Sequence, residues 1–312
     1  MAKGRKTSLK AALSSQQSRL KKKQDAAHAA QHAEQQGKHA KVAQAKGKGK
    51  AVPRAPTIPF TATDRILLIG EGNFSFARAL TVEPPAALEY LPARNITATA
   101  YDSEDDCYAK YPDAHAIVTV LRQKGAEVIF GVDATKLEKY PALRGRNFDK
   151  IVWNFPHAGK GITDQDRNIL SNQLLLLGFL RSAASFLTTG PVPVVVKKKK
   201  PKSGESEDEG QDSASEAGTS NSVAPRGSIL ITLRNVTPYT LWDLPKLAKS
   251  PPPPKQANEP PNPRYIQLRS FVFDRKVWKG YEHRMTKGER VHGQGTTGVG
   301  GEDRMWQFCL KD

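Results

Sequence analysis

The chain has 312 residues, enough for one large domain or two small ones, and a formal net charge of +17 at pH 7. Residues 1–55 hold fourteen Lys and Arg against two acids, Asp25 and Glu34, and so carry +12 of that charge. Two cysteines and seven scattered histidines provide neither a disulfide framework nor a zinc-binding spacing. No apolar run approaches the roughly 20 residues of a membrane-spanning helix. We therefore expect a soluble intracellular protein without a metal ion or membrane attachment.

Three segments have a low-complexity composition. Residues 1–55 are built from Ala, Gln, Lys, Ser and Gly and cannot bury a core, which predicts a disordered basic tail. Its charge favours nucleic acid binding or nuclear import, and the alternative is a solvated solubility tail. Residues 197–227 predict a disordered insertion and residues 250–264 a proline-rich loop. The remaining chain, 56–312, predicts one folded domain.

Within that domain, short apolar runs alternate with helix-like stretches. The expected strands cover 66–69, 96–101, 127–130, 150–153, 228–233, 266–273 and 305–310. The expected helices cover 74–80, 105–111, 115–124, 164–187 and 239–248. This order predicts an α/β fold, a mainly parallel seven-stranded sheet with helices on both faces. The last two strands have no helix between them, so we expect them to form an antiparallel hairpin.

The first strand runs into a glycine turn, in the stretch RILLIGEGNFSFARAL at 65–80. Ligands of parallel sheets bind beside such a turn, near the N-terminus of the following helix. Gly70 would allow the turn, and Gly72 would let a ligand approach the backbone. The third glycine of a dinucleotide motif is replaced by Ser75. An acid in the loop, Glu71, suits a cofactor with a positively charged end, such as S-adenosylmethionine.

Polar side chains follow the next three strands. Asp102 is placed to accept hydrogen bonds from ribose hydroxyls, and Asp133 from an adenine amino group. Asn154 opens the segment NFPH at the end of the fourth strand. Each of these residues alone could instead cap a helix. Their occurrence on successive strand ends favours a shared pocket with the glycine turn.

Several motifs resemble those of the eukaryotic 25S rRNA (uridine-N3)-methyltransferases. They are LLIGEGNFSFA, YDSEDD, FGVDATKL, FDKIVWNFPHAGKG, ILITLRNVTPYTLWDL and GYEHRMTKG. The resemblance implies a Rossmann-like fold, S-adenosylmethionine as cofactor, and methylation of N3 of a uridine in large-subunit rRNA or a pre-ribosomal particle. It also implies a nuclear, nucleolar location. The cofactor-binding residues expected from the turn and the strand ends are Gly70, Glu71, Gly72, Asn73, Asp102 and Asp133.

The catalytic candidates lie in the NFPH segment. Uridine N3 carries a proton that must leave, and His157 is the best-placed proton acceptor. The alternative is a histidine bonded to a nearby backbone carbonyl. Asn154 would offer an amide to a base edge, and Phe155 a stacking face. In the segment GYEHRMTKG we expect RNA contacts from Tyr281, His283, Arg284 and Lys287, the alternative being an ordinary polar loop.

Two other functions fit the same sequence. One is a methyltransferase of this fold that acts on tRNA or on another base. The other is a non-catalytic ribosome-assembly factor that uses the fold to bind RNA. The intact GEGN turn, Asp102 and Asp133 favour an enzyme over the second alternative.

Overall fold

The computed structural model describes residues 56–159, 161–193, 224–253, 261–285 and 301–311. The predicted tail, residue Lys287, residues 197–223 of the predicted insertion and residues 254–260 of the predicted proline-rich loop lie outside these residues. The last residues of the predicted insertion, 224–227, belong to the folded domain. Arg226 donates hydrogen bonds from Nε to the Gly190 carbonyl (2.9 Å) and from Nη1 to the Leu310 carbonyl (2.7 Å). The composition had assigned these four residues to the insertion, because it does not show that Arg226 bonds to the rest of the domain.

In the part of the chain that the structure describes, seven strands form one mixed sheet in the order β3-β2-β1-β4-β5-β7-β6. The first five are parallel, and β7 is antiparallel to both β5 and β6. The bounds are β1 Ile66–Ile69, β2 Ile96–Thr99, β3 Glu127–Ile129, β4 Lys150–Asn154, β5 Ser228–Arg234, β6 Tyr265–Val272 and β7 Asp303–Leu310. All seven predicted strands are confirmed, as is the antiparallel pairing of the last two.

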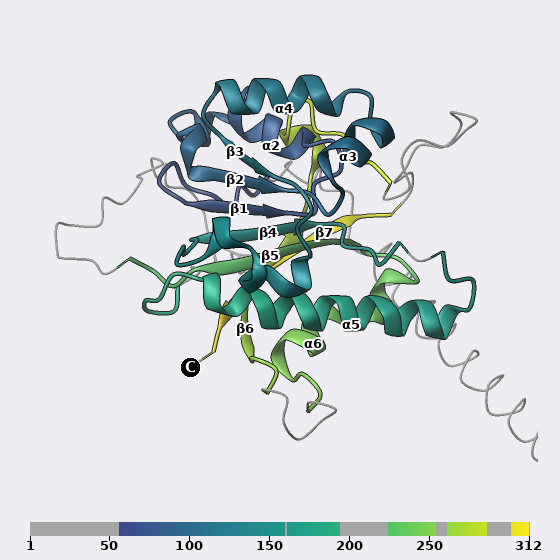
Figure 1. Ribbon diagram of the computed structural model, residues 1–312. Coiled ribbons are helices and arrows are strands. Elements are labelled where there is room, and N and C mark those ends of the chain that lie inside the picture. The colour runs from purple at the N-terminus through teal and green to yellow at the C-terminus, as the bar shows by residue number, and fades with distance from the viewer. Residues whose placement is uncertain (1–55, 160, 194–223, 254–260, 286–300, 312) are drawn as a thin grey trace, which may run out of the picture. The chain divides into compact units, whose positions relative to one another are not determined.

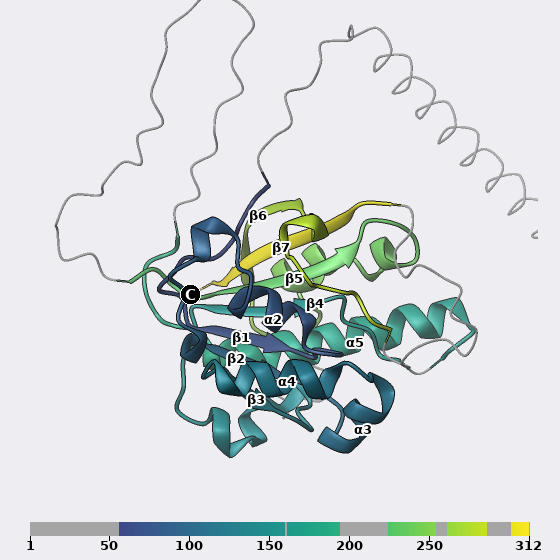
Figure 2. The same cartoon turned by 90° about the horizontal axis from the view of Figure 1, so that it is seen from above.

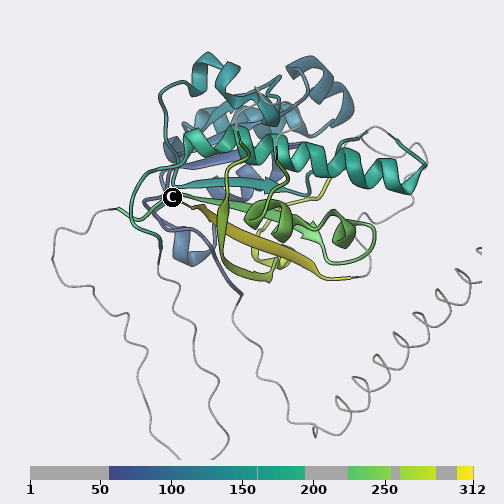
Figure 3. The ribbon, with the colours of Figure 1, turned by 90° about the horizontal axis from the view of Figure 1, so that it is seen from below.

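Helices cover both faces of the sheet (Figure 1). The α-helices are α2 Ser75–Thr81, α3 Glu104–Lys110, α4 Ala114–Gln123, α5 Gln165–Ala183 and α6 Leu244–Lys249. Figure 2 shows α2 and α4 over one face, and Figure 3 shows the long helix α5 crossing the other. Short 3-10 helices complete the links: η1 Ala86–Leu88, η2 Ala93–Asn95, η3 Ala134–Lys139, η4 Pro141–Leu143, η5 Ala184–Phe186, η6 Tyr239–Trp242 and η7 Arg275–Val277.

The continuous apolar run of β1 fills two cores at once. Ile66 and Leu68 pack with the residues of α2 and α4, whereas Leu67 and Ile69 pack with those of α5. All four side chains are buried, because successive residues of a strand point to opposite faces and both faces are covered. This double burial suits an inner strand, and β1 lies between β2 and β4, so the glycine turn leaves the sheet from an inner strand.

The link from β3 to β4, where no helix was predicted, and the long helix α5 each have a physical explanation. The link from β3 to β4 contains only 3-10 turns, because Pro141 and Gly145 interrupt a stretch in which Lys136 already departs from helical geometry. Among the described residues, one helical stretch, Gln165–Phe186, is long and apolar enough to cross a membrane. Its side chains Leu176, Phe179 and Leu180 are buried in the core, which accounts for that composition.

Candidate active site

Two hollows lie side by side at the carboxyl ends of the parallel strands. The first, called here the loop pocket, is lined by residues of 70–75, 101–102, 154–155 and 281–284 and by Tyr111. The second, called the helix cleft, has a volume of about 450 Å³ and is lined by residues of 132–135, 153–158 and α5. They share Gly70, Tyr101 and Phe155. A hollow of this size at this end of a parallel sheet suits a small organic ligand.

The two glycines of the turn are required for different reasons. Gly70 has φ +62°, and a Cβ there would lie 2.8 Å from Nε1 of Trp153. Gly72 has an ordinary backbone, and a Cβ there would lie 3.3 Å from Cβ of Arg284 and 3.4 Å from Cζ of Tyr111. The side chains of Arg284 and Tyr111 occupy the space beside the Cβ position of Gly72. Gly72 nevertheless lines the loop pocket, so close approach of a ligand to its backbone stays a prediction.

Glu71 and Asn73 stabilise the start of α2. The backbone N–H of Ala77 donates to Oε2 of Glu71 (3.3 Å), and Oδ1 of Asn73 accepts from the N–H of Ser75 (3.2 Å). Burial raises the pKa of Glu71 to about 7, although backbone hydrogen bonds act to lower it. Glu71 also lines the loop pocket, so a positive ligand there would favour its charged form.

The two strand-end aspartates lie in different hollows. Asp102 lines the loop pocket and forms an ion pair with Lys110, while Ser103 caps α3 in its place. Asp133 lines the helix cleft and caps η3 by accepting from N (2.9 Å) and Oγ1 (2.7 Å) of Thr135. Burial acts to raise the pKa of Asp133, but these hydrogen bonds and Lys136 outweigh it and lower the pKa. The helix-cap alternative is therefore present at Asp133, which also remains at the cleft wall.

The last residue of β4 carries a polar group that has no partner among the described residues. Oδ1 of Asn154 accepts a hydrogen bond from Oγ1 of Thr232 (2.8 Å). Its Nδ2 is buried and donates to none of the described residues. Phe155 follows in the left-handed region, with φ +53°. Such strain in a non-glycine residue is concentrated at functional sites, because the surrounding structure must hold it.

His157 is bonded to its own loop. The backbone N–H of Gly159 donates to Nδ1 (2.9 Å), and burial lowers the pKa of the ring. In the neutral ring Nδ1 is then the acceptor, and the proton resides on Nε2. The lone pair that a general base needs is engaged, so this arrangement disfavours the predicted role as proton acceptor. The bond also differs from the stated alternative, because the ring accepts from a backbone N–H and does not donate to a backbone carbonyl.

Residues 281–285, called here the strap, lie on the glycine turn. Oγ of Ser75 donates to the carbonyl of Glu282 (3.0 Å), and the N–H of Glu282 lies 3.1 Å from the same Oγ. Nη2 of Arg284 binds Oδ2 of Asp113 (3.1 Å), which also accepts from Nδ2 of Asn73 (2.8 Å). Asp113 therefore joins the turn to the strap, and the strap forms one wall of the loop pocket.

The strap side chains predicted to contact RNA are engaged within the protein. Tyr281 packs with Phe76 (ring centroids 5.4 Å apart), and burial raises the pKa of its hydroxyl. The ring of His283 lies 4.3 Å from that of Phe155, and burial with nearby arginines lowers its pKa to about 4. Arg275 lies over the ring of Phe155 at 5.0 Å. These rings pack on one another, yet Phe155, Tyr281 and His283 also line the loop pocket, so their contact with RNA stays a prediction.

Sequence reasoning missed Tyr101 and Asp113. Tyr101 follows β2, is 72% exposed, and lies between the two hollows. Its position immediately before Asp102 was the available signal. Asp113 gave no signal, since its partners Asn73 and Arg284 are far from it in the chain.

The sheet order, the glycine turn and the polar strand ends define the Rossmann-like methyltransferase class. Residues 67–285 match the family described as rRNA (uridine-N3-)-methyltransferase BTM5-like, and the chain belongs to that family.

Relatives of the chain vary widely in length. A Saccharomyces cerevisiae protein named 25S rRNA (uridine(2634)-N(3))-methyltransferase is 27% identical over 253 residues, covering 75% of this chain and 69% of the relative. Heavy metal-associated isoprenylated plant protein 41 of Arabidopsis thaliana is 38% identical over 144 residues, covering 46% of this chain and 27% of the relative. Human ferredoxin-fold anticodon-binding domain-containing protein 1 is 36% identical over 126 residues, covering 40% of this chain and 18% of the relative. The chain thus spans about a quarter of the plant relative.

Proposed function

We propose that this protein is an S-adenosylmethionine-dependent methyltransferase that methylates N3 of a uridine in large-subunit rRNA. The observation that carries the proposal is the buried Nδ2 of Asn154, a donor with no partner among the described residues, beside the glycine turn. Family membership and the name of the yeast relative supply the substrate class.

The residues of the two hollows fit the cofactor. The Glu71 carboxyl suits the positively charged end, and Asp102 at the end of β2 suits the ribose hydroxyls. The helix cleft, with Asp133 and the apolar side chains of α5, has room for the adenine. When bound, S-adenosylmethionine supplies an electrophilic methyl group attached to a sulfonium. The backbone turn at Gly70–Ser75 and the strap would hold the cofactor in place.

Asn154 would stabilise the charge that develops on the substrate base. When the N3 proton of uridine leaves, the negative charge spreads over the two flanking carbonyl oxygens. The Nδ2–H of Asn154 can donate to one of them, and Thr232 fixes the amide by binding its Oδ1. A buried donor aimed at developing charge contributes about 3–4 kcal/mol to a reaction barrier. We assign the departing proton to water, because Nδ1 of His157 is engaged by Gly159.

The proposed substrate also implies where in the cell the protein acts. The basic segment 1–55 would bind RNA or serve nuclear import, which places the protein in the nucleus and nucleolus, where large-subunit rRNA is made. Methylation of tRNA or of another base is the enzymatic alternative, and a non-catalytic assembly factor the other. Imaging of a fluorescent fusion, with and without residues 1–55, tests the location.

Mass-spectrometric mapping of methylated uridines tests the activity. Purified protein, S-adenosylmethionine and an rRNA fragment should yield 3-methyluridine, and cells lacking the protein should lose one such nucleotide. Asn154→Ala should bind the cofactor in titration calorimetry but lose the product. A methylated tRNA, with rRNA unmodified, would support the enzymatic alternative. Cofactor binding absent from the wild type would support the assembly factor.

A further inference from the structure

A third hollow, of about 360 Å³, lies at the opposite end of the sheet, and its lining is basic. Its arginines are Arg65, Arg94 and Arg146, and its other lining residues are Asn95, Gly145, Asn147 and Phe148. None of these described lining residues is acidic. We call it the arginine hollow.

The position of the arginine hollow follows from the parallel strands. Arg65 immediately precedes β1, Asn95 immediately precedes β2, and Phe148 lies two residues before β4. Since β1 is parallel to both neighbours, these residues meet at the amino ends of the strands. Gly70 lies five positions after Arg65 along an extended strand, which corresponds to a distance of about 17 Å. The hollow is therefore distinct from the candidate active site.

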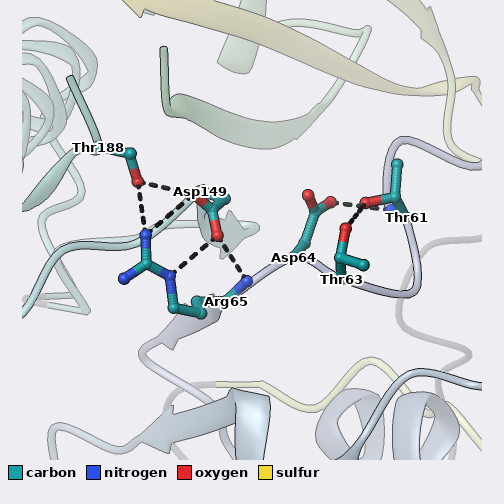
Figure 4. A network of polar contacts seen from close by, with 6 residues as sticks. All are labelled: Thr61, Thr63, Asp64, Arg65, Asp149 and Thr188. Carbon is teal, nitrogen blue, oxygen red and sulfur yellow. Dashed lines mark hydrogen bonds and ion pairs between the residues drawn. The ribbon is translucent and has the colours of Figure 1, made fainter. Parts of the chain in front are cut away.

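Two of the arginines are held in place and keep N–H groups that no described residue uses. Arg65 donates from Nε (3.1 Å) and Nη2 (3.3 Å) to Asp149, and Nη2 also reaches Thr188 (Figure 4). A turn in which Asp64 accepts from the N–H of Thr61 (2.8 Å) precedes it. Nη1 of Arg65 is left for a ligand. An arginine fixed by an acid loses little side-chain freedom when it binds an anion.

Arg146 has a similar arrangement. It pairs with Glu127, donates from Nη2 to Oγ1 of Thr97 (2.8 Å), and lies over the ring of Phe148 at 5.2 Å. Arg94 is exposed and contacts no acid among the described residues, so it supplies uncompensated positive charge. Guanidinium and amide N–H groups around one hollow match the oxygens of a phosphate.

We propose that the arginine hollow binds a phosphate group of the RNA substrate. This inference rests on the proposed function for the choice of RNA, while the phosphate chemistry follows from the hollow itself. A folded RNA is large enough to reach both ends of the sheet, so the contact would anchor it while the target base enters the active site. Such a contact positions the RNA without reading its sequence.

Charge reversal at Arg94 tests the proposal, with Lys249→Glu as the matched control. Both residues are exposed, and Lys249 lies on α6, which packs against β6 at the sheet edge. Binding of an rRNA fragment would be measured by filter retention from 50 to 200 mM salt. Arg94→Glu should weaken binding about five- to tenfold at 0.1 M salt and lower the log–log salt slope by roughly 0.7–0.9. Lys249→Glu should change neither value.

Further measurements separate the possible outcomes. Thermal unfolding and cofactor affinity of Arg94→Glu should match the wild type. Equal RNA affinity for the two variants would overturn the proposal, as would saturable binding of adenosine monophosphate that depends on Arg94 while RNA affinity does not. If the wild type binds rRNA through Arg94 but methylates no uridine, the proposed function is wrong, whereas the proposal that the arginine hollow binds an RNA phosphate is supported.

Discussion

Two loops that leave neighbouring strands at the same end of the sheet use their polar groups in opposite ways. In residues 70–75, after β1, the side chains of Glu71, Asn73 and Ser75 all bond to the protein. In residues 154–159, which begin with the last residue of β4, Nδ2 of Asn154 is buried without a described partner. Backbone strain does not separate the two loops, because Phe74 (φ +62°) and Phe155 (φ +53°) both lie in the left-handed region.

This difference suggests that the two loops have different functions. A loop whose polar groups are already bonded is preorganised, so it can present its backbone and one carboxyl to a cofactor without rearranging. A loop with a buried, unbonded donor lacks a bond that a substrate can supply. We therefore expect changes in residues 70–75 to alter cofactor affinity and stability, and changes in residues 154–159 to alter turnover.

The largest effect should come from Asn154→Ala. Loss of the Nδ2 donor should lower single-turnover methylation by about 10²–10³-fold, because the charge on the base loses its stabilising bond. Cofactor affinity should stay within twofold, as calorimetry would show. Thr232→Val keeps the amide and only frees its orientation, so it should cost less. A loss of cofactor affinity in Asn154→Ala that matches its loss of turnover would remove the contrast between the loops.

Glu71→Gln tests the carboxyl of the first loop. Because the pKa of Glu71 is about 7, the wild-type carboxyl is mostly neutral at pH 6 and mostly charged at pH 8. Wild-type affinity for S-adenosylmethionine should rise across this range. The glutamine variant should bind about 10–100-fold more weakly at pH 8, the usual scale for a bond to a charged group, and show a flat profile.

The control for this measurement is Glu83→Gln, which removes an exposed acid just beyond α2. Stability provides a second readout. The folded state holds the Glu71 proton up to about pH 7, whereas the unfolded chain loses it near the ordinary pKa of 4.5. The free energy of unfolding should therefore fall as pH rises from 4.5 to 7, and Glu71→Gln should remove that part of the decline. Superimposable affinity profiles for wild type and Glu71→Gln would exclude the carboxyl from the cofactor site.

Substitutions at Gly70 and Gly72 distinguish the cost of an unfavourable backbone conformation from the cost of side-chain packing. Gly70→Ala should lower the free energy of unfolding by about 1–3 kcal/mol, because alanine is strained at φ +62° and its Cβ meets the Trp153 indole. Gly72→Ala should cost less, since its backbone is ordinary and the nearest contact, Cβ of Arg284, lies 3.3 Å away. Denaturant titration of both variants checks the order. Equal losses would indicate that strap packing matters as much as the turn.

The sequence predicted the fold well because burial leaves a direct mark on composition. A strand covered on both faces reads as an unbroken apolar run, and the run at Ile66–Ile69 is matched residue for residue. The glycine turn and the residues at three strand ends were also found, since parallel strands bring their ends together.

Contacts made by the strap could not be predicted. Ser75 and Glu282 are 207 positions apart, and a polar segment has the same composition whether it lies in solvent or on another loop. The engagement of Phe155 by His283 and Arg275 depends on that docking. The tautomer of His157 depends on the hydrogen bond that its Nδ1 accepts from the backbone N–H of Gly159. The direction of that N–H is set by local dihedral angles and not by residue type.

His157 should give the smallest effect, although it lies in the loop assigned to turnover. Burial lowers the pKa of the ring, so it is neutral at pH 7, and its Nδ1 is engaged. A neutral histidine in this tautomer can donate a proton in a hydrogen bond but has no lone pair ready to accept one. His157→Ala should therefore lower turnover less than tenfold, an order of magnitude below the usual contribution of a general base.

The pH dependence of turnover decides between the two roles. If water takes the N3 proton, the profiles of wild type and His157→Ala should be parallel, because uridine ionises equally in both. His157→Asn, whose side-chain oxygen can still accept from the Gly159 N–H, should recover most of the loss, as expected for a residue that shapes the loop. A loss of 10²–10⁴-fold that shrinks as pH rises would instead restore His157 as the proton acceptor. That result would also mean that the Gly159 bond opens when the base enters, so the second loop would change its bonding during the reaction and the first would not.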